Sequence, residues 1–365
     1  MTDRALGAPH TMSLQKNEAA LQRAREVVGL YGDPDVTWGI SLEVSFAAPV
    51  DLSGAAPRLV AMVSEHPHLG PVPTVRMVEP QAWERVREES ASADFSDGHL
   101  VRLLATSDSR TFFVTAHHGV CDGLGLAAIV SSLVGRELTS SARGVGERRS
   151  SRGFLRSSVV RLGEALVNPP ARFGGSQDPA RADEPESLLQ ESATLRKANG
   201  TTVCAALTRI YASWPQGNSG GGRRFLVVMG ASRRAPGESA PDRRTAYLRI
   251  PLKLGWDEAR VAAAIRAVEP EPDFPETSAR GVGPMVMRAL KNRLGYTVNV
   301  SNLGLMTGEG LESVAMFPAV NGPQAVGIGL ASTPQRTTMS VRTRRSDFSD
   351  VEARLLLRRI IDEMR

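Results

Sequence analysis

The hydrophobic pattern in the first third of the chain changes repeatedly between the period of a strand and that of a helix. From Ile40 to Phe46 every second residue is apolar, which is typical of a strand with one buried face. A helical pattern follows, with Ser53 as the expected N-cap and Pro57 in the first turn. The elements predicted here are a strand at 38–46, a helix at 52–66, strands at 100–104 and 111–116, and an apolar helix at 124–134.

The pattern breaks down in the middle of the chain, where Ser, Gly, Pro and Arg replace regular apolar spacing. A short helix at 154–166 is the one element predicted there. We expect a crossover between two lobes, with an N-terminal lobe at 1–145, a linker at 146–186 and a C-terminal lobe at 187–365. The composition of this linker fits a mobile surface segment and a docking segment for a partner equally well.

The second half again mixes strands and helices. Its first predicted element is a long helix that is interrupted at Asn199 and Gly200. Because both halves alternate between the two kinds of element, we predict an α/β (or α+β) protein with two lobes of similar size. The elements predicted here are helices at 187–214, 257–268, 284–294 and 350–364, and strands at 225–231, 246–252 and 296–304.

Composition narrows the class of protein. A hydrophobic content of 41% over 365 residues is enough for substantial cores. Cys121 and Cys204 lie far apart, which excludes a disulfide scaffold and a thiolate zinc site. The N-terminus carries no apolar signal segment, and the apolar runs are shorter than the roughly 18 residues of a membrane span. We therefore expect a cytoplasmic protein without a membrane span.

The charge is moderately basic, because 44 Lys and Arg residues face 39 Asp and Glu residues and give a net charge of +5. Arginine predominates, and its planar group suits phosphates and acidic surfaces. A solvated basic surface explains the same excess. Nucleic acid is not an expected partner, because aromatic residues make up only 5% of the chain and are not interleaved with the arginines.

One segment carries recognisable chemistry. His117 and His118 close a predicted strand, and Asp122 and Gly123 open the next predicted helix. A histidine at the end of a strand, held by a tight turn, can present a ring nitrogen to a cleft and take a proton near neutral pH. In this interpretation Asp122 braces the turn, and Gly123 permits close packing or an unusual backbone angle.

Other interpretations of this segment remain open. Two adjacent histidines with an aspartate could bind a metal, but neighbouring strand residues face opposite sides, so we predict no metal site. Cys121 could act as a nucleophile with a histidine as its base, although an inert buried cysteine is the commoner outcome. For His117 we expect a core histidine with satisfied hydrogen bonds.

The pattern HHxxxDG, here His117 to Gly123, resembles the signature of the condensation-domain superfamily of acyltransferases, which has the chloramphenicol-acetyltransferase-like fold. This group includes peptide-synthetase condensation domains, polyketide-associated acyltransferases, wax ester synthases and plant acyltransferases. Four further segments resemble the family in the same order along the chain. They are residues 65–70, 198–214, 227–234 and 298–304.

The resemblance implies two similar lobes that meet at an active-site tunnel. His118 would act as the general base or as an orienting hydrogen-bond partner. Asp122 would be structural and paired with an arginine of the second lobe, for which Arg233 is the best match and Arg234 is not excluded. Ser301 and Asn302 would line the tunnel and donate to an oxyanion, although a strand end followed by a turn explains them equally well.

The function that follows is a stand-alone acyltransferase, expected in bacterial specialised metabolism, that moves an acyl group from a thioester to an amine or alcohol. Its donor would be acyl-CoA or an acyl group on an acidic carrier protein. We expect no bound cofactor and a monomer. The chain is shorter than typical peptide-synthetase domains and lacks the DFGW-type motif of the plant enzymes. A non-catalytic docking module, or an enzyme of cyclisation, epimerisation or hydrolysis with the same tunnel, remains an alternative.

Overall fold

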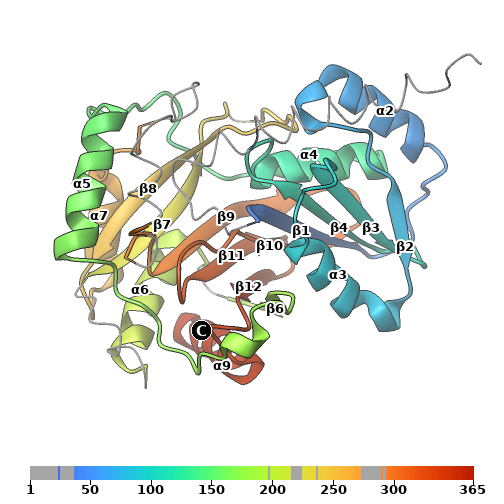
Figure 1. Cartoon of the computed structure of the whole chain (residues 1–365). Helices are drawn as coiled ribbons and strands as arrows, with labels where there is room; N and C mark the ends of the chain where they lie inside the picture. Colours follow the sequence, from blue (N-terminus) through green and yellow to red (C-terminus); the bar gives the residue numbers. More distant parts are fainter. Residues whose placement is uncertain are drawn as a thin grey trace, which may run out of the picture.

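The protein folds around two mixed β-sheets with helices packed against them (Figure 1). The structure, a computed structural model, describes residue 24 and residues 37–195, 198–214, 224–235, 237–272, 289–290 and 293–365. Within these residues no helix combines the length and the apolar character that a bilayer span requires. The two sheets confirm the predicted α/β class.

The first sheet is built mainly by the N-terminal half of the chain. Within the described residues, its strands are β1 (Gly39–Phe46), β2 (Val75–Val78), β3 (Val101–Thr106), β4 (Thr111–His117) and β10 (Leu311–Phe317). They lie in the order β10–β1–β4–β3–β2. β2 runs parallel to β3, and the other neighbouring strands are antiparallel.

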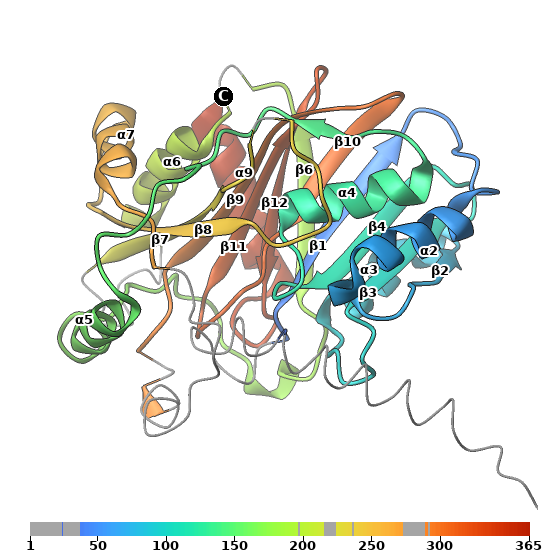
Figure 2. The same cartoon turned by 90° about the horizontal axis from the view of Figure 1, so that it is seen from above.

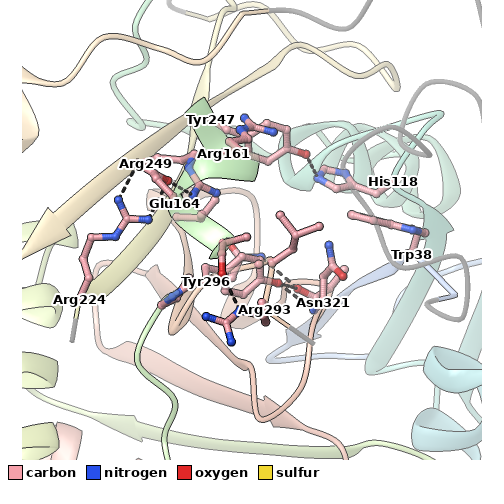
Figure 3. Close-up of a pocket in the computed structure, with 17 residues that line it drawn as sticks. Trp38, His118, Arg161, Glu164, Arg224, Tyr247, Arg249, Arg293, Tyr296 and Asn321 are labelled. Carbon is pink, nitrogen blue, oxygen red and sulfur yellow. Dashed lines mark hydrogen bonds and ion pairs between the residues drawn. The ribbon is translucent and has the colours of Figure 1, made fainter. Parts of the chain in front are cut away.

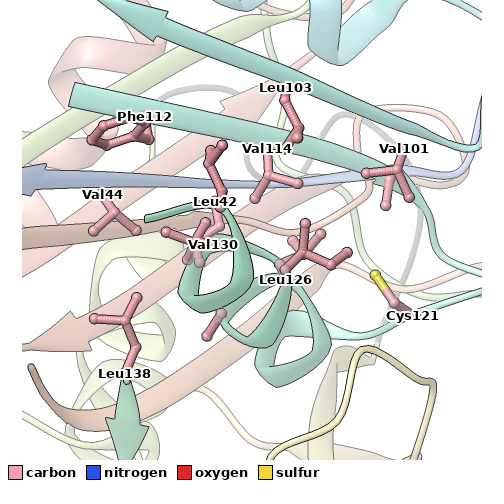
Figure 4. Packing of buried hydrophobic residues seen from close by; sticks show 14 of the residues in the cluster. Leu42, Val44, Val101, Leu103, Phe112, Val114, Cys121, Leu126, Val130 and Leu138 are labelled. Atoms are coloured by element: carbon pink, nitrogen blue, oxygen red, sulfur yellow. The ribbon is translucent and has the colours of Figure 1, made fainter. Parts of the chain in front are cut away.

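Helices cover both faces of this sheet. The alternating apolar side chains from Ile40 to Phe46 pack in one core with α2 (Ala55–Glu65) and α4 (Gly123–Val134). Figure 4 shows Leu42 and Val44 in this core beside Leu126 and Val130 of α4. The opposite face is covered by α3 (Trp83–Ser92), where the strand's polar side chains lie. The predicted first strand and its buried face are therefore confirmed.

The second sheet follows the order β6–β12–β11–β9–β7–β8, and the short β5 pairs with β9. β9 runs parallel to β11 and β7, whereas the other pairs are antiparallel. The strands of this sheet in the described residues are β5 (Thr139–Ser140), β6 (Ser187–Ala193), β7 (Phe225–Ser232), β8 (Thr245–Leu252), β9 (Val298–Thr307), β11 (Val326–Ser332) and β12 (Thr337–Thr343).

Helices α6 (Gly200–Ala212), α7 (Glu258–Ala267) and α9 (Asp350–Met364) pack on one face of the second sheet and bury its largest core (Figure 2). The linker helix α5 (Phe154–Val167) approaches the opposite face, where Glu164 bonds to Arg249 of β8. Three short 3₁₀ helices complete the described elements. They are η1 (Pro67–Leu69), η2 (Pro80–Ala82) and η3 (Pro179–Arg181).

The prediction for residues 187–214 is wrong in its first part. Residues 187–193 form the edge strand β6, which pairs with β12 along its whole length. Tertiary pairing overrides local helix preference there. The break at Asn199 is the start of α6, because its side chain accepts hydrogen bonds from the backbone of Thr201 and Thr202.

The start of α2 also differs from the prediction. The N-cap of α2 is Gly54, and Ser53 bonds instead to the carboxylate of Asp51. The helix therefore has its N-cap one residue later than predicted, because the bond from Ser53 to Asp51 competes with capping by Ser53. Most of the predicted helix at 284–294 lies outside the described residues.

The two sheets share segments of chain. β10 comes from the C-terminal half yet pairs with β1 in the first sheet, and β5 precedes the linker yet pairs with β9 in the second. Arg342 of β12 is fully buried and donates to the backbone carbonyls of Gly39 and Ala91, on the other sheet's side. These connections hold the lobes together around the loop that follows β4.

Candidate active site

The two adjacent histidines lie where β4 ends, and they face opposite ways. His117 is buried, packs edge-on against Phe95 and accepts a hydrogen bond at Nδ1 from the backbone of Gly119. His118 is half-buried and turns its ring toward the cleft between the lobes (Figure 3). His117 thus has the surroundings of a core histidine, while His118 is available to a substrate.

Two hydrogen bonds define the tautomer of His118. Its Nδ1 lies 3.0 Å from the carbonyl oxygen of Cys121, which can only accept, so Nδ1 carries the hydrogen. In the neutral ring Nε2 is then the acceptor, and it lies 2.6 Å from the hydroxyl of Tyr247, which donates to it. The basic nitrogen of His118 is therefore Nε2.

The surroundings favour the neutral ring. Burial, followed by the nearby charge of Arg243, lowers the pKa of His118 from 6.5 to about 4, although the bond to Cys121 and the charge of Asp122 oppose this shift. At neutral pH the imidazole is unprotonated and can accept a proton at once.

Tyr247 was not among the predicted site residues. It lies in β8, whose residues alternate between the core of the second lobe and the cleft. Leu248 and Ile250 pack in the core, so Tyr247 and Arg249 point the other way (Figure 3). The alternation of polar and apolar residues along this strand is the signal that could have identified them.

Asp122 is the N-cap of α4 and ties this turn to the second lobe. Its carboxylate accepts from the backbone of Gly125 at 2.9 Å and of Arg244 at 2.8 Å, and from the hydroxyl of Thr245 at 2.8 Å. Nη1 of Arg234 lies 2.7 Å from both carboxylate oxygens. Burial alone would raise the pKa of Asp122, but Arg234 and these donors hold it below its ordinary value.

The partner of Asp122 is therefore Arg234, not Arg233, which the sequence favoured. Successive residues of an extended segment point to opposite sides, and Arg233 points outward and donates to the carbonyl of Arg148 at 2.7 Å. Arg234 is buried and also holds Asp242 with Nη2. The motif and a loop of the second lobe are thus joined by one guanidinium group.

Two chambers meet at His118. The first, which includes Trp38 and Tyr296, encloses about 900 Å³ with its open mouth. The second chamber encloses about 650 Å³, again with its open mouth included, and lies on the side of α4. His118 and Tyr247 line both chambers, so the imidazole stands at the junction of the two spaces.

The remaining predicted site residues line the second chamber. Ser301, Asn302 and Gly123 all contribute to its wall. The side-chain oxygen of Asn302 accepts from the backbone of Gly304 at 2.9 Å, as the turn interpretation requires. A Cβ atom on Gly123 would lie 2.9 Å from Cδ2 of Leu303, which shows that close packing explains this glycine.

The surroundings of Cys121 do not suit the nucleophile alternative. Burial raises the pKa of the Cys121 thiol well above its ordinary value, and the side chain packs in the core of the first lobe. In the part of the chain that the structure describes, no group of three or more His, Cys, Asp or Glu side chains is arranged to bind a metal.

The overall fold matches solved condensation domains. The starter condensation domain of rhizomide synthetase, in complex with C8-CoA and Leu-SNAC, superposes with a TM-score of 0.58 at 13% identity, covering 98% of this chain and 95% of that one. The first condensation domain of the calcium-dependent antibiotic synthetase, in complex with a substrate analogue, has a TM-score of 0.58 at 14% identity, covering 96% and 94%. No protein-family model and no curated protein matches the sequence. The chain therefore has the fold of condensation domains.

Proposed function

We propose that this protein, which has the condensation-domain fold, transfers an acyl group from a thioester to an amine or alcohol, with His118 as the general base. The observation that carries the proposal is the neutral Nε2 atom of His118 at the junction of two chambers. A donor and an acceptor can enter from opposite sides and meet at this nitrogen.

The reaction needs one proton shuttle and no redox step. The acceptor replaces the hydroxyl of Tyr247 at Nε2, attacks the thioester carbon and gives its proton to His118. The tetrahedral intermediate collapses, the C–S bond breaks, and the leaving thiolate takes the proton back from His118. Tyr247, released from Nε2, can donate to the developing oxyanion, as can Ser301 and Asn302. Asp122 acts through Arg234 to position the loop.

The second chamber suits the thioester donor. Arg143 and Ala142 line both this chamber and an adjoining hollow that extends toward Arg234 and Gly146. Beyond the hollow lies a basic segment with Arg148, Arg149 and Arg152. Such a mouth fits the phosphates of coenzyme A or an acidic acyl carrier protein. A solved neighbour contains C8-CoA, which agrees with a thioester donor.

Thiol release tests the proposal. Purified protein is mixed with acyl-CoA or acyl-carrier-protein thioesters, with and without amine or alcohol acceptors. We expect acceptor-dependent release, which falls by roughly 10²- to 10⁴-fold in His118→Ala. His117→Asn is a matched control for the motif, provided that its unfolding midpoint is unchanged. An equal rate in His118→Ala would exclude the general base, and release without acceptor would indicate hydrolysis instead.

A further inference from the structure

The wall of the first chamber carries an unusual concentration of charge (Figure 3). We call it the arginine–glutamate cluster. It consists of Arg161 and Glu164 from α5, Arg224 before β7, Arg249 from β8, and Glu271 behind them. All but Glu271 line the chamber that also contains His118.

The two carboxylates of the cluster make their shortest hydrogen bonds to two of its three arginines. Glu164 receives both Nη atoms of Arg224, at 2.6 and 2.7 Å. Glu271 is bonded by Arg161. Among the described residues, Arg249 makes the longer contacts with these carboxylates, with Nη2 at 3.2 Å from Glu164 and Nε at 3.7 Å from Glu271.

The cluster therefore holds more positive than negative charge. Among the described residues, three guanidinium groups face two carboxylates, which leaves one positive charge in excess. Burial, followed by the charge of Arg161, lowers the pKa of Arg249 to about 10 despite both glutamates. A desolvated cation of this kind is stabilised when an anion binds to it.

The position of Arg249 relates this charge to the reaction centre. Tyr247 and Arg249 are two residues apart on the same face of β8, which separates them by about 7 Å along the strand. Tyr247 in turn touches Nε2 of His118. Val228 and Leu294 add apolar wall to the chamber. One small molecule can therefore reach both His118 and Arg249.

We propose that the acceptor carries a carboxylate, which binds Arg249, while its amine or hydroxyl group lies at His118. This inference rests on the proposed acyl transfer and names its acceptor class: short amino or hydroxy carboxylates whose two polar ends are joined by a methylene chain. A carboxylate accepts two parallel hydrogen bonds from a guanidinium group, which fixes the orientation of the chain.

Matched acceptors test this inference without any variant. δ-Aminovalerate and its neutral amide differ only in the charge at the far end. We expect the carboxylate to have a KM roughly 10- to 100-fold lower than the amide, as the loss of a charge-assisted hydrogen bond predicts, with similar kcat values. Equal KM values for the two acceptors, in an enzyme that performs the transfer, would overturn the inference and leave the proposed function intact.

Variants of Arg249 then locate the preference. Arg249→Gln leaves the ion pairs Arg224–Glu164 and Arg161–Glu271 in place. Each remaining carboxylate therefore still has an arginine partner, and we expect the variant to fold. It should raise KM for δ-aminovalerate to that of the amide, whereas Arg249→Lys should keep part of the preference. Arg260→Gln, on the exposed surface of α7, is the control and should change neither value. A preference that persists in Arg249→Gln would contradict the assignment.

Calorimetric titration separates this inference from the proposed function. δ-Aminovalerate and its amide are titrated into the His118→Ala variant and into the same variant with Arg249→Gln, without thioester. We expect binding of the carboxylate only where Arg249 is present. If no thioester is ever turned over but this binding is seen, the transfer reaction is refuted and the carboxylate site is supported. If transfer occurs and the carboxylate binds equally with and without Arg249, the site is refuted.

Discussion

The hydroxyl of Tyr247 donates to Nε2 of His118 across 2.6 Å, and the two residues come from different lobes. His118 of the first lobe is thus held by a side chain of the second. The side chain of Tyr247 is half-buried, and desolvation raises the pKa of its hydroxyl, so the hydroxyl remains a neutral donor at physiological pH. Any change in the separation of the lobes alters this contact directly.

Replacing Tyr247 by Phe tests whether the hydroxyl assists the reaction. We expect kcat to fall by roughly 10- to 100-fold, because one donor to the developing oxyanion is lost, with little change in KM. Steady-state kinetics with a saturating thioester measures both values. A rise in kcat/KM would instead mean that Tyr247 only obstructs Nε2 in the free protein.

The pH dependence of the rate should show the low pKa of His118. Because the ring is neutral above its pKa of about 4, kcat/KM with an alcohol acceptor, whose hydroxyl group does not titrate in this range, should stay level from neutral pH to about pH 5 and fall below that. An acid limb centred near 6.5, the ordinary value, would contradict the lowered pKa of His118.

The same pKa makes a prediction for stability. Between about pH 4 and 6.5 the unfolded chain binds a proton at His118 and the folded chain does not, so the free energy of unfolding falls as the pH is lowered through this range. Urea denaturation at several pH values gives the free energy of unfolding of the native protein and of His118→Ala. This free energy should change less with pH in the variant. An equal pH dependence of the free energy of unfolding in the two proteins would argue against the low pKa of His118.

The pair of Asp122 and Arg234 should be important for folding, whereas Arg233 should not. Asp122→Ala leaves a buried guanidinium group with half of its partners and removes the N-cap of α4, so we expect a loss of about 3–5 kcal/mol. Arg233→Ala removes an outward side chain and should change stability by less than about 1 kcal/mol. Equal losses in the two variants would refute this distinction.

The sequence predicted well what depends on local pattern. The alternation in residues 38–46 and the apolar helix that starts after Asp122 correspond to elements of the structure, and the predicted interruption at Asn199 coincides with a helix start. Each of these features is determined by residues close together in the chain, through the spacing of apolar residues, helix capping or the residues of a turn. His117, the last residue of β4, is buried, and His118, the next residue, is half-buried and turned to the cleft, as expected for successive residues at a strand end.

What the sequence could not provide depends on contacts between distant segments. The choice between Arg233 and Arg234 depends on which of two successive side chains faces the other lobe. Tyr247 and Arg249 become site residues only because β8 presents one face to the cleft. β6 is a strand because β12 pairs with it. Arg234 lies 112 residues from Asp122 along the chain, and Tyr247 lies 129 residues from His118. The local pattern of the sequence therefore contains no information about these contacts.

The placement of β10 also constrains how the protein is made. Ser41 of β1 pairs with Phe317 of β10, so the first sheet cannot be completed until β10 has left the ribosome. A nascent N-terminal half has an uncovered edge at β1, open to pairing with other chains. The first sheet, which carries His118 at the end of β4, therefore gains its last strand only after the second lobe has begun to be synthesised.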